Sequence, residues 1–298
     1  RKPDAAILID FPDFNLRLAR ELHKLNIPVI YYVSPQLWAW RKGRIKQVQK
    51  YVSKMLVIFP FEADFYRDHG VKAEYVGHPL ADEPMPGITR EQLASANGLD
   101  PAKTWIALLP GSRRKEVSLN LPGIIESAKL LRGEYQFVLP VASSLDESWI
   151  RSLLLQRSLA VSLVHDARTA LLHSRAAIVA SGTATVEAAL IGTPFVMIYR
   201  VTPLTYAIGR RLVKLDRFGM VNLIAGREVV PEFVQDAFVP RTVAAKVTEI
   251  LADGPSRSQM LNDLAEVRQK LHPQGKTTAA DKAAEAVLTL VGTAAAGS

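Results

Sequence analysis

The feature that most constrains the fold of this chain is a repeated alternation of short apolar runs with amphipathic segments. In the N-terminal part, runs of strand length occupy residues 5–9, 29–33, 55–59 and 73–76. Farther along, such runs occupy residues 105–109, 137–141, 160–164, 177–180 and 195–199. Helix-like segments lie between most of them, and from about residue 239 the pattern is mainly helical. Strands that alternate with helices form parallel sheets covered by helices, so we predict an α/β protein.

A cluster of prolines and glycines separates the two series of strands. It contains Pro84, Pro86, Gly87, Gly98 and Pro101. Such a cluster is typical of a boundary between domains. We therefore predict a partial N-terminal α/β domain at 1–80, a linker at 81–103, a second α/β domain at 104–270, and a C-terminal segment at 271–298. In that last segment we expect a helix that packs back on the first domain, and a disordered tail from residue 293.

Composition narrows the classes of function. The 298-residue chain contains no cysteine, which excludes disulfides, thiolate metal sites and a cysteine nucleophile. No apolar run approaches the roughly 18 residues that a membrane span needs, and the first residues lack a signal-peptide pattern. Neither an HExxH motif nor an Asp-x-Asp pair is present, so we predict no metal and no cofactor. The stretch QGKTT at 274–278 resembles the end of a P-loop, but Lys270 stands where that motif requires glycine.

The chain is basic, with a net charge of +8 and a pI of about 9.6. An excess of positive charge suits an anionic partner such as nucleic acid, anionic lipid or a phosphorylated substrate. A basic surface without a partner would give the same charge, so this number alone leaves the alternatives open.

The stretch ALLPGSRRKEV, residues 107–117, ends a buried strand in a small turn rich in cations. A strand that stops in Pro-Gly-Ser and leads toward a helix presents backbone N–H groups and a positive helix end, which suits phosphate. Arg113 adds a planar fork for two phosphate oxygens, next to the hydroxyl of Ser112. A surface turn with solvated basic residues is the alternative.

The stretch ASGTATVEAALIGTPFV, residues 180–196, also follows a strand and opens a helix. Small residues at Gly182 and Thr183 let a ligand approach the backbone. Glu187, in the first turns of the helix, can accept hydrogen bonds from two ribose hydroxyls. The alternative is a helix capped by Thr183, in which Glu187 only favours the helix dipole.

The stretch ILIDFPDFN, residues 7–15, places two carboxylates after the first strand. Asp13 precedes a helix and is predicted to cap it. Asp10 is left without a structural role, and a carboxylate at the end of a strand can serve as a general base.

Tryptophans and cations occur together in SPQLWAWRKGRIKQVQK, residues 34–50. Trp38 and Trp40 are followed directly by Arg41 and Lys42. Aromatic rings beside cations suit a membrane interface, and they also suit single-stranded nucleic acid. A buried tryptophan beside a solvated helix is the third interpretation.

A second candidate for lipid contact is the amphipathic segment 203–215. Leu204 and Ile208 lie on its apolar stripe, with Arg211 at the margin of that stripe. An interfacial helix, a helix in a homodimer interface and an ordinary packed helix would share this pattern.

Taken together, these motifs are more specific than any one of them. DFPDFN, YYVSPQLWAW, VGHPLAD, LLPGSRRKEV, ASGTATVEA and NLIAGREVVPE occur in this order. In these motifs the chain resembles the bacterial lipid-A-disaccharide synthase family from about Pro3 to about Leu290. The combination of WAW, LPGSR and NLIAGRE carries most of that resemblance.

The resemblance implies a GT-B-like glycosyltransferase with two Rossmann-like parallel-sheet domains and a cleft between them. It implies an inverting, metal-independent enzyme that joins UDP-2,3-diacylglucosamine to 2,3-diacylglucosamine 1-phosphate (lipid X). The products are the lipid A disaccharide 1-phosphate and UDP. It also implies a cytoplasmic protein, peripheral on the inner membrane of a Gram-negative bacterium, that binds anionic lipid but not nucleic acid.

The resemblance also implies roles for particular residues. Ser112 and Arg113 would bind the UDP diphosphate, with Arg113 also acting in catalysis, and Gly182 and Thr183 would contribute to the same site. Glu187 would hold the ribose, Asn222 matches another site position, and Asp10 matches the proposed catalytic aspartate.

One departure from the family pattern concerns the beginning of the chain. Family members begin with a further α/β segment that contains a Gly-Glu-x-Ser-Gly-Asp loop, and no stretch here matches it. About 80–90 residues would make two further βα units, so we expect the first domain to be incomplete. Two other interpretations stay open: another UDP-sugar transferase or epimerase of the same fold, and a basic nucleotide- or RNA-binding module.

Overall fold

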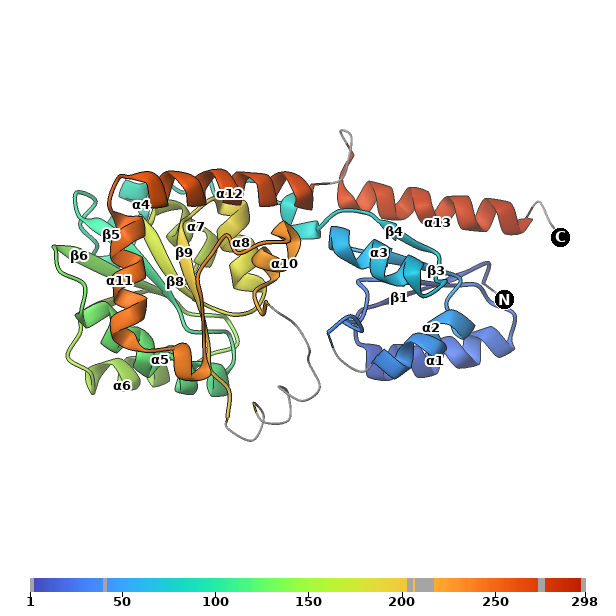
Figure 1. The fold of residues 1–298 in the computed structure, drawn as a ribbon, viewed down its shortest axis with the longest axis horizontal. Coiled ribbons are helices and arrows are strands. Elements are labelled where there is room, and N and C mark those ends of the chain that lie inside the picture. Colours follow the sequence, from blue (N-terminus) through green and yellow to red (C-terminus); the bar gives the residue numbers. More distant parts are fainter. Residues whose placement is uncertain (1–2, 40–41, 203–205, 207–216, 273–276, 296–298) are drawn as a thin grey trace. The chain divides into compact units, whose positions relative to one another are not determined.

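The computed structural model describes residues 3–39, 42–202, 206, 217–272 and 277–295. The chain divides into two compact units. The first unit comprises residues 1–83, 209–215 and 269–298, and the second comprises residues 84–208 and 216–268. Each unit contains a parallel sheet with helices packed against it (Figure 1).

The first unit contains a four-stranded sheet in the order β1-β2-β3-β4. Its strands are β1 (Ala6–Ile9), β2 (Val29–Tyr32), β3 (Lys54–Val57) and β4 (Ala73–Tyr75). Its helices are α1 (Pro12–Lys24), α2 (Ile45–Tyr51), α3 (Pro60–Asp68) and α13 (Ala279–Ala295). Because each pair of neighbouring strands is parallel, the loops that follow all four strands lie at one edge.

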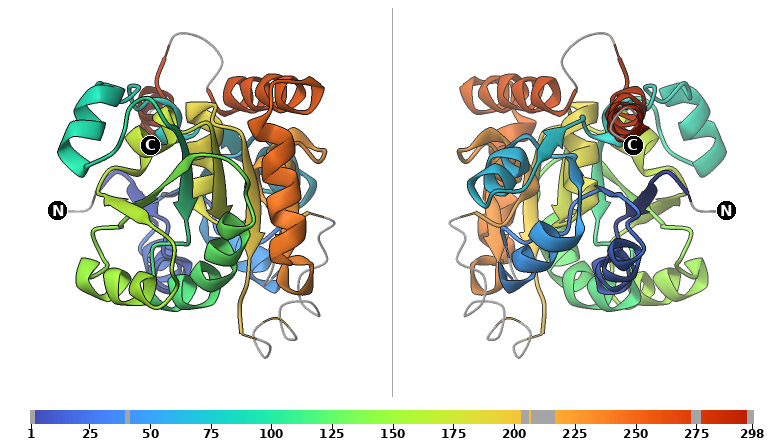
Figure 2. Two further views of the ribbon diagram at one scale, coloured as in Figure 1. Left: turned by 90° about the vertical axis from the view of Figure 1, so that its left-hand side faces the viewer. Right: turned by 90° about the vertical axis from the view of Figure 1, so that its right-hand side faces the viewer.

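Alternate side chains of these strands face opposite layers, as the period of two requires. Val29 and Tyr31 belong to the core that α1, α2 and α3 cover. Ile30 and Leu56 face the other way and pack with Ala286 of α13. The C-terminal helix therefore lies on one face of the N-terminal sheet and α1 on the other (Figure 2).

The second unit contains a six-stranded parallel sheet in the order β10-β9-β8-β5-β6-β7. Its strands are β5 (Thr104–Leu109), β6 (Tyr135–Pro140), β7 (Val161–Val164), β8 (Ala176–Ala180), β9 (Phe195–Tyr199) and β10 (Glu232–Val234). From β5 the chain adds strands on one side, then returns to add β8, β9 and β10 on the other. The winding direction thus reverses between β5 and β8.

Helices cover both faces of the second sheet. They are α4 (Arg90–Asn97), α5 (Arg114–Lys129), α6 (Glu147–Leu155), α7 (Ala167–His173), α8 (Thr183–Ile191), α10 (Met220–Ala225), α11 (Pro240–Leu251) and α12 (Pro255–Leu271). Trp105, Val138 and Val164 form one core cluster with residues of α4 and α7. Helices α5 and α11 pack against each other on the opposite face (Figure 2).

Some elements of the structure were not predicted. Strand β10 has only three residues, too few for an alternation to show. Helix α2 lies in the segment 34–50, where a solvated helix was one of the interpretations left open. Helix α10 falls in a segment for which no helix was predicted. Helix α4 lies inside residues 81–103, which were predicted to be a linker; Thr89 caps it and Gly98 ends it with a φ of 63°.

The prediction that Asp13 caps α1 is wrong. The helix begins at Pro12, its N-cap residue is Phe11, and no side chain accepts a capping hydrogen bond. Asp13 lies in the first turn, where it forms an ion pair with Arg44. Proline is well suited to the first helical position, and it places the start ahead of Asp13. At the other end of the chain α13 continues to Ala295, so part of the tail predicted to be disordered is helical.

The described residues contain neither a membrane-spanning helix nor a metal-binding cluster. Within them no helix is long and apolar enough to cross a bilayer. The same residues contain no group of three side chains arranged to hold a metal ion.

Candidate functional site

The loops that follow β5 and β8 lie next to each other at one edge of the second sheet. The two strands are paired, and Leu109 lies opposite Val179 near their ends. The order of the strands reverses at this point. In open α/β sheets, ligands bind beyond the carboxyl ends of the strands at such a reversal. The loops 110–113 and 181–183 therefore form a candidate ligand-binding site.

The loop after β5 is folded around the carboxylate of Glu116. Its Oε2 accepts hydrogen bonds from the backbone N–H groups of Ser112 at 3.1 Å and Arg113 at 3.3 Å. Its Oε1 lies 2.7 Å from Nη1 of Arg113. The side chain of Arg113 is 79% exposed, so its guanidinium is presented to solvent. A carboxylate of the protein therefore already occupies the N-terminus of α5.

The loop after β8 leaves the N-terminus of α8 open. Its N-cap residue is Gly182, with a φ of 144°, and no side chain caps the helix. Nothing lies within 4 Å of the point where a Cβ of Gly182 would stand. Thr183 is exposed at the first helical position, which overturns the alternative in which it caps the helix. The first N–H groups of a helix carry partial positive charge and need acceptors, so this end suits an anion.

Glu187 lies one turn beyond Thr183, on the same face of α8. The side chain is half-buried, and this burial raises the pKa of its carboxyl group, an effect that Arg168 opposes and Asp166 reinforces. Within the part of the chain that the structure describes, no hydrogen bond to the Glu187 side chain is found. Its two oxygens can therefore accept hydrogen bonds from a ligand.

Asn222 was predicted to bind UDP, and in the structure its side-chain amide is hydrogen-bonded to its own loop. The residue is fully buried. Its amide oxygen accepts hydrogen bonds from the N–H groups of Val229 and Val230, at 2.7 and 3.0 Å. Its amide nitrogen donates to the carbonyl of Val230 at 2.8 Å and to Glu232 at 2.7 Å. These bonds use the full capacity of the amide, so Asn222 holds its own loop together.

Asp10 directly follows β1 in the first unit, and its backbone is strained. Its φ is 48°, and that of Phe11 is 42°. The side chain of Asn15 and the hydroxyl of Tyr31 both donate to the carbonyl oxygen of Asp10, at 2.7 and 2.6 Å. Val33, which follows the neighbouring strand β2, has a φ of 61°, a rare value for a β-branched residue. Strain of this kind concentrates at functional sites.

A second carboxylate at the same edge of the first sheet was not predicted. Glu62 is buried and accepts hydrogen bonds from Ser34 Oγ at 2.7 Å, Trp38 Nε1 at 3.0 Å and the backbone N–H of Phe59 at 3.2 Å. Burial raises its pKa to about 7. A glutamate at the third helical position can accept a hydrogen bond from the N-cap backbone N–H, and the sequence FPFE at 59–62 places Glu62 there, although Phe59 has no side-chain acceptor to complete a capping box.

The residues predicted to contact lipid have different surroundings. Trp38 is half-buried, and its ring meets Phe61 edge to face at 5.0 Å. Together with the bond to Glu62, this packing holds Trp38 within the first unit. Lys42 opens a short 3-10 turn, Lys42–Arg44. The remaining residues predicted to contact lipid lie outside the described residues: Trp40, Arg41, Leu204, Ile208 and Arg211.

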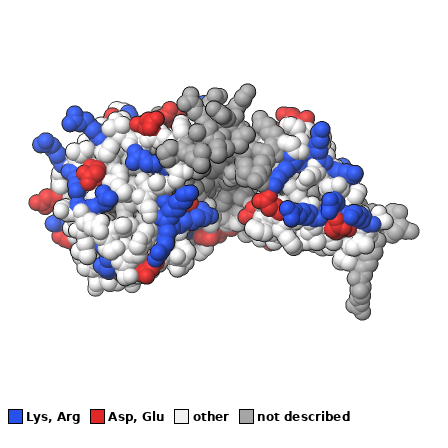
Figure 3. All heavy atoms as spheres, turned by 90° about the horizontal axis from the view of Figure 1, so that it is seen from below, with Lys and Arg blue, Asp and Glu red and all other residues white. Residues whose placement is uncertain are grey.

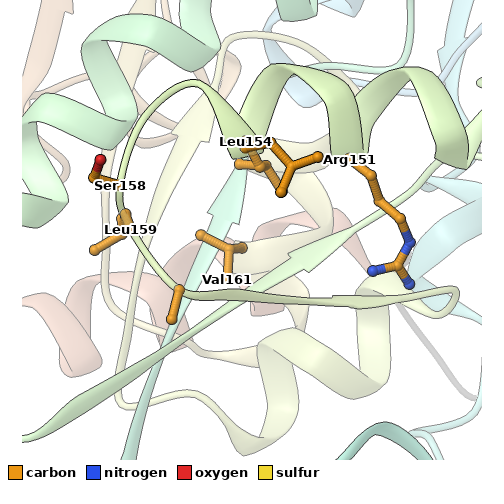
Figure 4. A pocket seen from close by; sticks show the side chains of 7 residues that line it. Arg151, Leu154, Ser158, Leu159 and Val161 are labelled. Atoms are coloured by element: carbon orange, nitrogen blue, oxygen red, sulfur yellow. The ribbon is translucent and has the colours of Figure 1, made fainter.

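A hollow of about 450 Å³ lies elsewhere on the second unit. Leu154, Leu159 and Val161 line it, with Arg151 at its side (Figure 4). It adjoins the end of α6 and the start of β7, which is the opposite edge of the sheet from the loops after β5 and β8. It shares no residue with the candidate site.

Comparison with known proteins decides which family has this arrangement. The family model described as lipid-A-disaccharide synthetase matches residues 1–287. The chain belongs to the lipid-A-disaccharide synthetase family. It is 58% identical over 294 residues to the lipid-A-disaccharide synthase of Koribacter versatilis, an alignment that covers 97% of this chain and 77% of that protein. It is 43% identical over 294 residues to the synthase of Geobacter metallireducens, covering 97% and 76%.

Solved structures with low identity share the fold. The UDP-GlcNAc 2-epimerase from Neisseria meningitidis, bound to UDP-GlcNAc, aligns with a TM-score of 0.62 at 13% identity, covering 97% of this chain and 77% of that one. Anabaena Alr3699/HepE in complex with UDP-glucose aligns with a TM-score of 0.59 at 12% identity, covering 95% and 78%. The calicheamicin glycosyltransferase CalG4 aligns with a TM-score of 0.58 at 14% identity, covering 98% and 76%.

Membership in the lipid-A-disaccharide synthetase family confirms the resemblance seen in the motifs. The predicted α/β, GT-B-like fold is confirmed as well. The chain is a glycosyltransferase of lipid A biosynthesis, a hexosyltransferase. The comparisons do not favour the epimerase or the nucleotide-binding module.

Proposed function

We propose that the chain transfers the diacylglucosamine unit of UDP-2,3-diacylglucosamine to 2,3-diacylglucosamine 1-phosphate. A hydroxyl oxygen of the acceptor forms a bond to the anomeric carbon of the donor. The bond from that carbon to the UDP oxygen breaks, and the hydroxyl proton passes to a base. The products are the disaccharide 1-phosphate and UDP.

The donor nucleotide is proposed to bind beyond the carboxyl ends of β5 and β8. The observation that carries this assignment is the open N-terminus of α8 at the reversal in strand order, next to the loop with Ser112 and Arg113. The diphosphate would accept hydrogen bonds from the first N–H groups of α8 and from the exposed guanidinium of Arg113. Glu187, one turn further along α8, would accept hydrogen bonds from the ribose hydroxyls.

The same positive groups would assist departure of the nucleotide. Negative charge builds on the UDP oxygen as its bond to the sugar breaks. Fixed N–H dipoles and a guanidinium stabilise such charge more in the transition state than in the ground state. Ser112 supports the loop that carries Arg113, because its carbonyl accepts a hydrogen bond from Ser144 Oγ at 2.8 Å.

Asp10 is proposed as the base that takes the acceptor's proton. Its exposed side chain has no hydrogen-bond partner among the described residues, while two side chains hold its backbone carbonyl. A carboxylate whose backbone is held in position, and whose oxygens form no hydrogen bond within the protein, can act as a general base.

Activity measurements test both assignments. The chain is incubated with both substrates and the release of UDP is followed. Asp10→Asn should lower kcat by about 10²-fold or more. Arg113→Ala should lower kcat/KM for the donor, because it removes a hydrogen bond to the leaving phosphate. Near-normal rates for either variant would remove that residue from its role.

We also propose that the first unit binds the surface of an anionic membrane. Figure 3 shows Lys and Arg side chains gathered on the face that carries α1 and α2. The exposed cations of these helices are Arg17, Arg20, Lys24, Lys46 and Lys50, two of which pair with Glu21. Phe11 and Phe14 are 67% and 57% exposed at the start of α1. Exposed aromatic rings beside cations suit the interface of a bilayer.

Co-sedimentation with vesicles tests the membrane proposal. Phe14→Ser should reduce the fraction bound to anionic vesicles, whereas Leu155→Ser, at a residue of the second unit that is 85% exposed, should not. Equal binding to anionic and neutral vesicles would contradict the role of the cations. Location on the cytoplasmic face of the inner membrane and assembly into a homodimer stay predictions.

A further inference from the structure

Glu116 holds the groups that a phosphate would otherwise use at the loop after β5. It accepts hydrogen bonds from two consecutive backbone N–H groups and from the guanidinium of Arg113. Backbone N–H groups at a helix N-terminus together with an arginine form a common anion site. Here the anion is supplied by the third residue of the same helix.

The loop is built for this close approach. Gly111 has a φ of 120°, which suits glycine. A Cβ at this position would lie 2.7 Å from Cβ of Glu116 and 2.8 Å from its Oε2. The backbone at 111 and the carboxylate of Glu116 therefore fit together only because residue 111 has no side chain.

Arg113 is the group that Glu116 and the diphosphate would share. Its Nη1 is bonded to Glu116, whereas its Nε and Nη2 have no hydrogen-bond partner within the described part of the chain. The ion pair is exposed, at 79% and 35% for the two side chains. An exposed pair of this kind is weak, so a second anion can compete for the guanidinium.

We propose that Glu116 competes with the UDP diphosphate for Arg113 and so weakens the hold of the enzyme on its product. This inference rests on the proposed donor site at β5 and β8. The competition should act more strongly on UDP than on the UDP-sugar. A terminal phosphate loses its second proton near pH 6, so at neutral pH free UDP carries about one negative charge more than the donor. The carboxylate repels the more highly charged species more, which favours exchange of product for new donor.

Binding measurements on the full chain test the proposal. Isothermal titration gives the Kd for UDP and, as a reference without phosphate, for uridine. Glu116→Gln should bind UDP about two- to five-fold more tightly than wild type, the range expected for an exposed ion pair. Its Kd for uridine should be unchanged. Glu126→Gln is the matched control, because Glu126 forms an i,i+3 pair with Lys129 at 3.0 Å on the same helix.

A double variant shows whether the gain in UDP affinity depends on Arg113. With Arg113→Ala already present, adding Glu116→Gln should give no further gain in UDP affinity. Glu116→Ala should shift UDP affinity in the same direction as Glu116→Gln, and it provides a second variant if the first does not fold. In steady-state assays, the inhibition constant for UDP should fall more than the KM for the donor.

The outcomes separate the inference from the function on which it rests. Unchanged or weaker UDP binding by both Glu116 variants, with normal UDP binding by wild type, overturns the role of Glu116 alone. A gain that persists without Arg113 does the same. If the wild-type chain binds no UDP, the proposed donor site fails, and the inference fails with it.

Discussion

Glu62 and Glu187 are both carboxylates whose pKa is raised by burial, yet their surroundings give them different tasks. Glu62 accepts hydrogen bonds from three protein donors, one of them the indole of Trp38. Glu187 is half-buried, and no such donor is found for it within the described residues. A buried carboxylate whose oxygens are used by the protein is structural, whereas a half-buried one with free oxygens is available to a ligand.

The raised pKa of Glu62 predicts a pH-dependent stability. Its pKa is about 7 in the folded chain against an ordinary value of 4.5, so the folded state prefers the protonated form. As pH rises through this window, wild type should lose stability relative to Glu62→Gln, by about 2 kcal/mol between pH 5 and pH 8. Urea unfolding of both proteins at the two pH values measures this difference. A difference that does not change with pH would contradict the assignment.

Glu187 predicts a specific loss of discrimination between nucleotides. If its carboxylate binds the ribose, Glu187→Ala should weaken UDP binding by about ten-fold or more, since hydrogen bonds to a charged group are lost. The variant should also stop distinguishing UDP from an analogue that lacks the 2′-hydroxyl. Titration of both ligands checks this, with Glu126→Ala on α5 as the control. Retained discrimination would place the ribose elsewhere.

At the scale of elements, the two helices that begin beside the strand reversal differ in what occupies their N-termini. Glu116 fills the end of α5, while α8 starts at an exposed glycine with open space around it. Sequence patterns identify both strand-to-helix turns, but they cannot tell at which of the two helix N-termini a side chain of the protein already accepts the N–H hydrogen bonds. That distinction depends on a side chain folding back onto its own loop.

The open end of α8 predicts that a side chain at position 182 blocks the ligand. Gly182→Ala should weaken UDP binding about ten-fold or more, because a methyl group stands where the backbone meets the phosphate. Gly98→Ala is the control for a methyl group added at a positive φ with open space around it; its φ of 63° lies in the left-handed helical region, so it imposes less strain than the φ of 144° at Gly182. Thermal unfolding separates the cost of strain from the loss of binding. Equal UDP affinity in the two variants would contradict the phosphate assignment.

The buried amide of Asn222 predicts a change in stability without a direct change in nucleotide contacts. Asn222→Ala leaves the N–H groups of Val229 and Val230 without their acceptor. The expected cost is about 2–4 kcal/mol of unfolding free energy, measured by urea unfolding. At a temperature where the variant is folded, its Kd for UDP should stay within a few-fold of wild type. A large loss of UDP affinity in a fully folded variant would instead support the predicted contact between Asn222 and UDP.

Across the whole molecule, the sequence predicts the fold well, because apolar periodicity reports burial in both sheets. The nine apolar runs match strands β1 to β9. What it misses are elements too short for an apolar pattern to show, such as β10, and side chains whose role depends on contacts distant in sequence. Glu62 binds Ser34 and Trp38, which lie 28 and 24 residues away, so no local pattern shows that network.

The motif residues show the same division. The motifs at 107–117 and 180–196 place their turns directly after β5 and β8, as the structure does, since strand ends are readable from the sequence. They do not reveal that the side chain of Asn222 forms hydrogen bonds to its own loop, or that the side chain of Glu116 occupies the end of α5. Those facts arise from packing and from hydrogen bonds that form only in the folded chain.

We place the nucleotide diphosphate at the reversal between β5 and β8, on α8 and Arg113. A crystal structure of the chain with UDP would show where the terminal phosphate binds. We expect phosphate oxygens about 3 Å from the backbone N–H group of Thr183 and from the guanidinium of Arg113. A phosphate that contacts neither the N-terminus of α8 nor Arg113 would contradict this placement.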